Sequence, residues 1–178
     1  MDDGETQGVL GGPDQIALRY KETCDWADLA ALRINLWLIE GYRSLIAGLH
    51  GVLDAVDPSM SAPRFLALRD LYLAEGHRLI QGEIQRRGKT SSGSVTRLMD
   101  GLEQDGLITR VFNAKDRRTN YVELTPKGLV VCDHLIPAVA RYSVDVCAGI
   151  EAGDREAFVR MLTLLARQAE PAGASLNA

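Results

Sequence analysis

The sequence predicts a mainly α-helical protein that carries one small β-hairpin. Long stretches on both sides of the middle of the chain place apolar residues every three or four positions, as amphipathic helices do. Two short runs in the middle, 107–112 and 120–124, instead alternate apolar and polar residues, as half-buried strands do. The polar loop 113–119 joins these runs. The fold class is therefore helical, with a single hairpin set between two groups of helices.

The N-terminal part is expected to hold a flexible tail and one long helix. The tail covers residues 1–24, because its beginning is rich in glycine and acidic residues and shows no periodicity. The helix starts near Asp25 and ends at Asp57-Pro58, since the residue before a proline disfavours helical backbone. Its apolar face is broader than a small domain can cover, which indicates burial against a partner subunit.

The middle region is expected to contain three shorter helices. Ser61 caps the first, and the second covers about 80–87. The third follows the turn Gly88-Lys89, is capped by Ser91 and ends at Gly106, where glycine allows a left-handed stop. After the hairpin come two more helices.

The C-terminal part begins with a strong helix signal. Thr125 is a cap, and Pro126 occupies the first helical position, where proline is favoured. Pro137 lies inside this long helix and is expected to bend it. A last amphipathic helix opens at Asp154, and residues 171–178 are expected to fray.

The third helix of the middle region begins with small hydroxyl side chains. Ser91, Ser92, Ser94 and Thr96 lie in its first turns, and Arg97 follows. Short side chains let a helix lie deep in the major groove of double-stranded DNA, where arginine can contact base edges or phosphates. The simpler explanation for Ser91 is helix capping alone. The pattern predicts a helix that reads DNA.

The loop of the hairpin is basic. Lys115 and Arg117 are expected to contact phosphates, whereas Asp116 repels phosphate and is expected to orient a neighbouring arginine. A polar helix followed by a basic hairpin is typical of a winged helix-turn-helix, with the helix in the major groove and the hairpin at an adjacent groove. The prediction is a winged helix-turn-helix that binds double-stranded DNA.

The net charge of −4 is unevenly distributed. Residues 77–127 hold ten basic and six acidic side chains, which gives +4 and leaves −8 on the remainder. This division would orient the middle region toward phosphates. A solvated charged surface accounts for it equally well. For Arg97 the alternative to a DNA contact is a salt bridge to Asp100 or Asp116.

Three motifs in this order resemble those of the MarR family of bacterial transcriptional regulators, and the resemblance covers about residues 25–170. The first motif is the helix 94–103 followed by Gly106-Leu107-Ile108. The second is Asp116-Arg117-Arg118 in the hairpin loop, and the third is Leu124-Thr125-Pro126-Lys127-Gly128 at the start of the next helix.

The resemblance implies a winged helix-turn-helix DNA-binding domain over 61–124 and an α-helical dimerisation domain formed by 25–60 and 125–170. It further implies a homodimer on a pseudopalindromic operator, with its two recognition helices about 34–36 Å apart. Family members are usually repressors that small, often aromatic acids release. The resemblance also implies that Arg118 enters a narrow minor groove.

The chain departs from the family pattern at the turn before the recognition helix. The family usually carries a Leu-Gly pair there, and this chain has Gly88-Lys89. Loss of the leucine is expected to loosen packing between the two helices, while Lys89 gains a phosphate contact.

Candidates for binding a small effector are fewer. Trp37, Arg43 and His50 on the long first helix and Tyr72 on the next offer aromatic walls and a cation for an acid. Core packing or surface charge is the alternative for each.

The sequence favours no enzyme and no cofactor. His50, His77 and His134 have no metal-ligand spacing, and the sequence contains neither a phosphate-binding glycine loop nor a nucleophile elbow. The acidic N-terminus differs from a signal peptide, and no apolar run reaches the ~20 residues that span a bilayer. A cytoplasmic protein is therefore expected.

Two alternative functions remain open. Cys24, Cys132 and Cys147 are expected to be reduced thiols, and a thiol-based redox regulator using Cys24 is one alternative. A helical module that binds protein rather than DNA is the other alternative.

Overall fold

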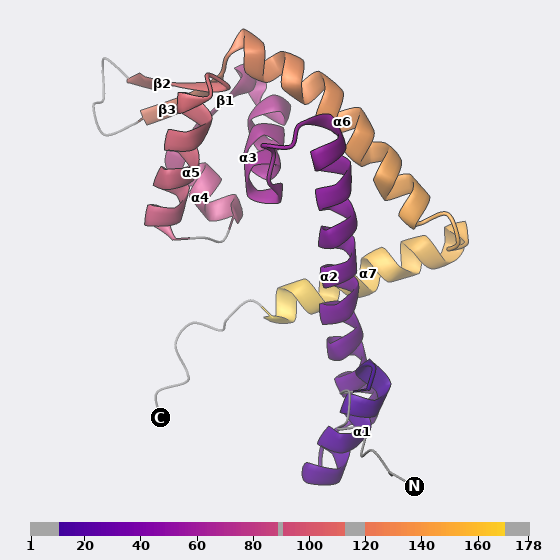
Figure 1. Cartoon of the computed structure of the whole chain (residues 1–178). Coiled ribbons are helices and arrows are strands. Elements are labelled where there is room, and N and C mark those ends of the chain that lie inside the picture. The colour runs from indigo at the N-terminus through magenta and orange to yellow at the C-terminus, as the bar shows by residue number, and fades with distance from the viewer. Residues whose placement is uncertain (1–10, 89–90, 113–119, 170–178) are drawn as a thin grey trace, which may run out of the picture.

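The computed structural model describes residues 11–88, 91–112 and 120–169. In chain order the elements are α1 (Pro13–Thr23), α2 (Leu29–Val56), α3 (Ala62–Leu73), a 3-10 turn (Glu75–His77), β1 (Arg78–Ile80), α4 (Gln81–Gly88), α5 (Ser92–Gln104), β2 (Ile108–Phe112), β3 (Asn120–Leu124), α6 (Pro126–Val146) and α7 (Ala152–Ala169) (Figure 1). The mainly helical fold with a hairpin is confirmed.

Local side-chain chemistry sets several of these boundaries as the sequence predicts. The Ser91 hydroxyl accepts a hydrogen bond of 3.3 Å from the backbone N–H three residues on, and the Thr125 hydroxyl does the same at 3.0 Å. Gly106 ends α5 with a φ of +69°, a conformation that glycine adopts without strain. Ser61 occupies the N-cap position of α3, but its side chain makes no capping hydrogen bond.

The N-terminal region differs from the expectation of a flexible tail over 1–24. Residues 13–23 form α1, and Ala17 on this helix is fully buried. Asp14 fixes α1 against α2 by accepting hydrogen bonds from Arg33 Nε at 2.6 Å and Trp37 Nε1 at 3.1 Å. The partners of α1 lie about twenty positions further along the chain, so local composition could not indicate them. The expectation for 171–178 falls outside the described residues.

The sheet contains a third strand that the sequence pattern did not predict. β1 pairs antiparallel with β3, which also pairs antiparallel with β2, so the order is β1-β3-β2. Val122 in the central strand lies opposite Leu79 on one side and Arg110 on the other. β1 is only three residues long, with one buried side chain. Such a strand is too short to show alternation in sequence.

The hydrophobic core lies where the compact middle region meets one end of α2 and the beginning of α6. Side chains from every one of these parts are fully buried in it, and they include Leu53, Leu68, Leu71, Met99, Leu102, Ile108, Val122 and Leu135. This core holds α3, α4, α5 and the sheet together as one unit, which places α5 at its surface (Figure 1).

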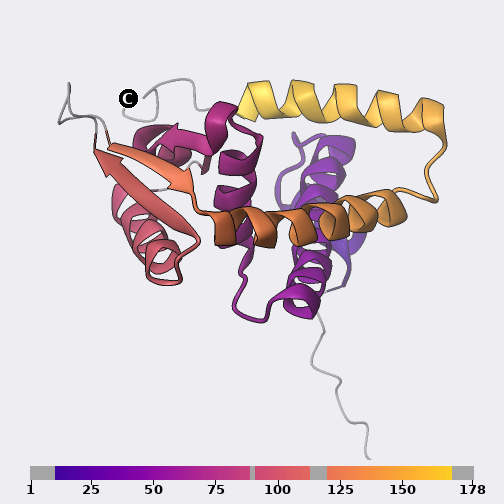
Figure 2. The same cartoon turned by 90° about the horizontal axis from the view of Figure 1, so that it is seen from above.

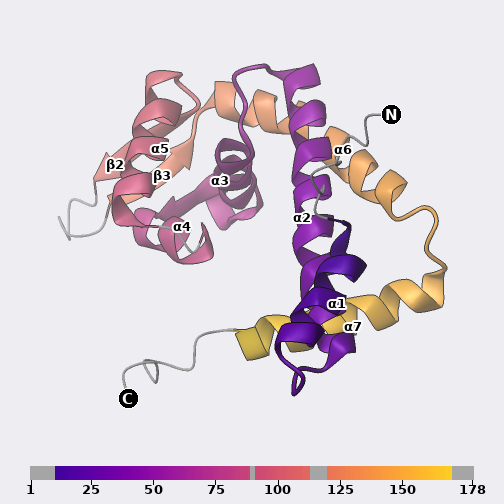
Figure 3. The same ribbon diagram turned by 60° about the horizontal axis from the view of Figure 1, so that its bottom comes forward.

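The remaining helices extend away from this unit. α2 and α6 leave it in different directions, and α7 returns to cross α2 (Figures 1 and 2). α1 lies at the far end of α2 (Figure 3). α2 and α6 approach closely where they pack. A Cβ added at Gly48 on α2 would lie only 2.3 Å from the hydroxyl of Tyr142 on α6. Within the described residues, no helix has the length and apolar character that crossing a membrane requires.

Candidate nucleic-acid interface

One face of α5 is buried and the opposite face is open. Val95, Met99 and Leu102 are buried, at spacings of four and three residues that align them on one side of a helix. These three side chains anchor α5 to α3 and β2. Ser92, Ser94, Thr96 and Arg97 are exposed, so the residues predicted to read DNA share the outer face of one helix.

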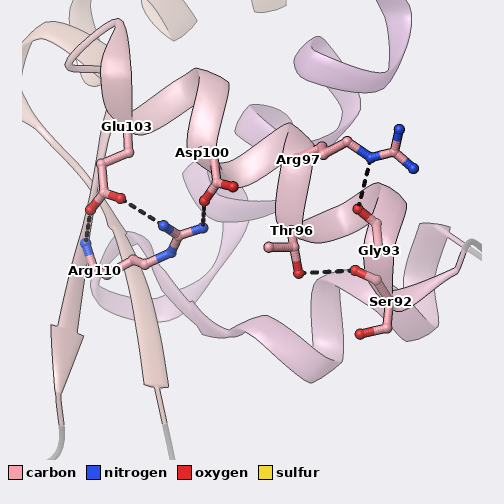
Figure 4. A network of polar contacts seen from close by, with 7 residues as sticks. All are labelled: Ser92, Gly93, Thr96, Arg97, Asp100, Glu103 and Arg110. Atoms are coloured by element: carbon pink, nitrogen blue, oxygen red, sulfur yellow. Dashed lines mark hydrogen bonds and ion pairs between the residues drawn. The ribbon is translucent and has the colours of Figure 1, made fainter.

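The exposed polar side chains of α5 are held by their own helix (Figure 4). The Thr96 hydroxyl donates to the Ser92 carbonyl at 3.0 Å, and Arg97 Nε lies 3.4 Å from the Gly93 carbonyl. Ser91 and Ser94 hydroxyls lie 2.9 Å apart. These contacts keep the hydroxyl groups close to the helix, so its N-terminal half presents a low, polar surface.

Arg97 does not form the salt bridge with Asp100 that was considered as its alternative role. Asp100 instead pairs with Arg110, its Oδ1 lying 2.6 Å from the Arg110 Nη2. In Figure 4 the Arg97 side chain points away from this pair. Among the described residues, no carboxylate lies within ion-pair distance of Arg97, so its guanidinium has terminal N–H groups available. Asp116, the other alternative partner, lies outside the described residues.

Arg110 belongs to this site, although the sequence analysis included it only in the count of basic side chains. It lies on β2 and contacts Glu103 twice, through its backbone N–H at 3.1 Å and its guanidinium at 2.8 Å. Together with the pair to Asp100, these contacts join the hairpin to α5 (Figure 4). Asp100 and Glu103 are three residues apart and so share one helix face, and this spacing was the sequence signal for a basic partner.

The C-terminal end of α5 is fastened by a second set of contacts. Arg64 on α3 forms an ion pair with Asp105, and Lys127 on α6 donates to the Asp105 carbonyl at 2.8 Å. The Thr125 hydroxyl donates to the Gly106 carbonyl at 2.7 Å. These contacts connect the C-terminal end of α5 to α3 and to the start of α6.

The other residues predicted to contact DNA lie outside the described residues. These are Lys89, in the turn before α5, and Lys115, Asp116, Arg117 and Arg118 in the hairpin loop. The strands that carry this loop are in place, so the hairpin itself is confirmed.

The four effector candidates are not brought together. Trp37 lines a groove between α2 and α7, whereas Arg43 pairs with Glu40 at 3.8 Å and is largely exposed. His50 is exposed on α2. Tyr72, on α3, donates its hydroxyl to Asp133 at 2.8 Å, and this hydrogen bond raises the pKa of Tyr72. The structure therefore does not group these residues into one pocket.

The three cysteines differ in burial. Cys132 is buried against α3, and desolvation by burial, with a further effect of Asp133, raises the pKa of its thiol to about 11. Cys24 and Cys147 are half-buried. No group of three or more potential metal ligands is found among the described residues.

Residues 60–119 match the model of the MarR family. The match takes in α3, α4, α5 and β2, the elements that form and support the polar helix face. The match covers about a third of the chain, so the similarity to the MarR family is shown for this segment. The curated relatives that the chain matches include HTH-type transcriptional regulators.

A curated relative and two solved structures illustrate the similarity. The repressor YetL of Bacillus subtilis is 29% identical over 103 residues, which cover 58% of this chain and 62% of YetL. The chain thus matches about three fifths of that relative's length.

The structural similarity extends further than the sequence match. Sco3205, a MarR family regulator from Streptomyces coelicolor solved in complex with DNA, has a TM-score of 0.71 at 21% identity, covering 82% of this chain and 92% of Sco3205. Bordetella bronchiseptica BpsR, whose DNA binding 6-hydroxynicotinic acid regulates, has a TM-score of 0.64 at 18% identity, covering 75% and 98%. At these identities the two structures support the MarR fold alone.

Proposed function

We propose that this protein binds double-stranded DNA and regulates transcription, with α5 as the recognition helix. The observation that carries the proposal is the exposed face of α5, where small hydroxyl side chains and Arg97 stand opposite a fully buried apolar face. Such a surface fits the major groove, because short side chains allow the backbone to approach the base edges. The first backbone N–H groups of α5 can also donate hydrogen bonds to a phosphate, as helix N-termini do.

The protein acts as a homodimer. The groove between α2 and α7 has a volume of about 660 Å³ and is lined mainly by apolar side chains. Trp37 on α2 and Phe158, Met161 and Leu164 on α7 are each about half exposed, and none of the residues of α7 is buried. A helical element of a second copy would remove this apolar surface from water. Two-fold symmetry is the commonest arrangement of soluble oligomers.

A two-fold dimer defines the form of the operator. Two recognition helices related by a two-fold axis read a pseudopalindrome whose half-sites lie about 34–36 Å apart. In this proposal, residues 61–124 form the DNA-binding domain, and residues 25–60 and 125–170 form the dimerisation domain. The basic hairpin residues Lys115, Arg117 and Arg118 contact the phosphates and minor groove beside each half-site, and Lys89 adds a phosphate contact.

We further propose that the protein is a repressor released by a small aromatic acid. YetL is a repressor, and BpsR responds to an aromatic acid. Release requires that the ligand favour a spacing of the two recognition helices that misfits the operator. The contacts of Asp105 with Lys127 and Arg64 offer a route from the long helices to α5.

Selection of bound fragments from genomic DNA with the purified protein tests the function directly. Recovered sites should contain two half-sites one helical turn apart. Binding to a recovered site, followed by fluorescence anisotropy, should weaken steeply between about 50 and 200 mM salt, because phosphate contacts release counterions. Recovery of no common site, together with salt-independent binding of protein partners, would instead indicate a protein-interaction module.

A further inference from the structure

Gly93 lies at the centre of the outer face of α5. Because successive residues of an α-helix are rotated by about 100°, Gly93 lies about 160° around the helix from Val95, nearly opposite the buried side chains. Gly93 is exposed, and Arg97 follows one turn later, with its Nε 3.4 Å from the Gly93 carbonyl (Figure 4). A helix that enters the major groove with its apolar side toward the protein brings this point closest to the base edges.

The fold itself does not require a glycine at position 93. Gly93 lies within α5 and lacks the positive φ of Gly76 and Gly106. Apart from its chain neighbours and its own helix backbone, no atom of the described residues lies within 4 Å of the point that a Cβ would occupy. At Gly128, by contrast, a Cβ would lie 2.1 Å from a backbone oxygen. Since glycine destabilises a helix relative to alanine, Gly93 lowers stability and gains no contact among the described residues.

The side chains around Gly93 leave a methyl group and a cation facing outward. The Thr96 hydroxyl donates its proton to the Ser92 carbonyl at 3.0 Å, so the methyl group is the part of Thr96 without a polar partner. The guanidinium of Arg97 has no carboxylate within ion-pair distance among the described residues. The centre of the outer face therefore combines a gap at Gly93, the methyl group of Thr96 and the available guanidinium of Arg97.

The base edge that is complementary to such a gap carries a methyl group of its own. Of the four unmodified bases, only thymine displays one in the major groove, at C5, and the methyl group of threonine is a suitable contact for it. We propose that the gap at Gly93 receives the C5-methyl group of one thymine in each half-site, in contact with the Thr96 methyl group. Gly93 and Thr96 are then specificity-determining residues. This inference rests on the proposed function, because it requires the outer face of α5 to lie in the major groove.

Replacement of thymine by deoxyuridine in the operator tests the contact from the DNA side. Deoxyuridine lacks only the C5-methyl group and pairs with adenine as thymine does. The duplex is a site recovered by genomic selection, in which each thymine is replaced in turn, together with its symmetry mate in the other half-site. At one position the full-length wild-type protein should lose affinity by about fourfold for each half-site, as expected for one buried methyl group.

Gly93→Ala tests the contact from the protein side. The added methyl group fills the gap, so affinity for the thymine operator should fall about tenfold or more. The midpoint of thermal unfolding should stay unchanged or rise by up to about 4 °C, because alanine favours the helix. The variant should bind the uracil operator more tightly than the thymine operator, which reverses the preference of the wild type. Gly82→Ala is the matched control: it is the second residue of α4, as Gly93 is of α5, its Cβ direction is equally open, and it should keep that preference.

Two substitutions of Thr96 separate the methyl group from the hydroxyl group. Thr96→Ser removes the methyl group and keeps the hydroxyl, so it should reduce the preference for thymine over uracil. Thr96→Val keeps a methyl group at the same place and should retain the preference. These variants test the contact independently of Gly93→Ala.

The outcomes distinguish this inference from the proposed function. An operator that is insensitive to every replacement of thymine, or the same preference in wild type and Gly93→Ala, would overturn the thymine contact while operator binding stands. An equal loss by Gly93→Ala on operator and random DNA would overturn it too, since it would show close approach to a phosphate instead. Recovery of no common site would overturn the inference and the proposed function together.

Discussion

At the scale of single residues, the role of Arg97 depends on its lack of a described ion-pair partner. Arg97→Ala should weaken operator binding by about 1–3 kcal/mol and relax the preference at one position of each half-site, as for a lost base contact. Anisotropy titrations with operator and random DNA measure both effects. Arg160→Ala, an exposed arginine on α7, is the control. An equal loss on operator and random DNA would show a phosphate contact instead.

Arg110 is expected to position the hairpin rather than touch DNA. Arg110→Ala removes contacts with Asp100 and Glu103 that are partly exposed, so the free energy of unfolding should fall by only about 1 kcal/mol. Hydrogen exchange at the β2 amides should accelerate, and operator affinity should fall by more than the stability does. A double-mutant cycle with Asp100→Ala isolates the pair. Additive effects in that cycle would argue against coupling between helix and hairpin.

The burial of the three thiols predicts the order in which they react, which bears on redox regulation. Cys24 and Cys147 should react with a thiol reagent in the folded protein, and Cys132 only on unfolding, because it is buried with a pKa of about 11. The raised pKa means that the folded state binds this proton more tightly. Its stabilising effect is present below the ordinary pKa of 9.0 and is lost as pH rises toward 11.

Urea unfolding at pH 7.5 and at about pH 10 checks the sign of this linkage. Wild type should lose more stability between the two conditions than Cys132→Ala, which carries no thiol. Equal losses would mean that Cys132 does not titrate differently in the folded state. Unchanged operator binding after peroxide treatment would remove Cys24 as a redox sensor.

At the scale of elements, the junction of hairpin and α6 depends on Gly128. A Cβ at this position would lie 2.1 Å from the Leu107 carbonyl oxygen, which itself accepts a hydrogen bond from the Thr125 N–H. Gly128→Ala should therefore destabilise the protein by about 1–3 kcal/mol, as overpacking against backbone does.

Thermal or urea unfolding measures this loss against a matched glycine. Gly82 lies in α4 with open space around its Cβ direction, so Gly82→Ala should be neutral or stabilise by up to about 1 kcal/mol. A larger loss of stability in Gly128→Ala than in Gly82→Ala would show that the Leu-Thr-Pro-Lys-Gly segment requires glycine for steric reasons. Similar stability of the two variants would contradict it.

At the scale of the whole molecule, the proposed dimer depends on the apolar face of α7. Phe158→Glu places a charge on the half-exposed apolar face of α7, so it should dissociate the dimer and reduce operator affinity, since one half-site alone binds weakly. Light scattering at micromolar concentration measures the mass. Glu156→Gln, on the same helix but outside the groove lining, should stay dimeric. A monomeric wild type would overturn the dimer.

The sequence by itself determined the features that depend on neighbouring residues. The caps Ser91 and Thr125, the left-handed Gly106 and the alternating strands of the hairpin were all predicted, because capping, turn conformation and side-chain alternation act within a few positions of the chain. The exposed hydroxyl face of α5 follows from the same local periodicity. These features were enough to indicate the fold class and the resemblance to the MarR family.

Only the tertiary structure decided which distant residues meet. The folding of α1 against Arg33 and Trp37, the pairing of β1 with β3 and the capture of Arg110 by α5 all join segments that are separated in sequence. The dispersal of Trp37, Arg43, His50 and Tyr72 has the same origin. Contacts of this kind depend on how helices pack around a shared core, and periodicity within one helix carries no information about the neighbour that will cover it.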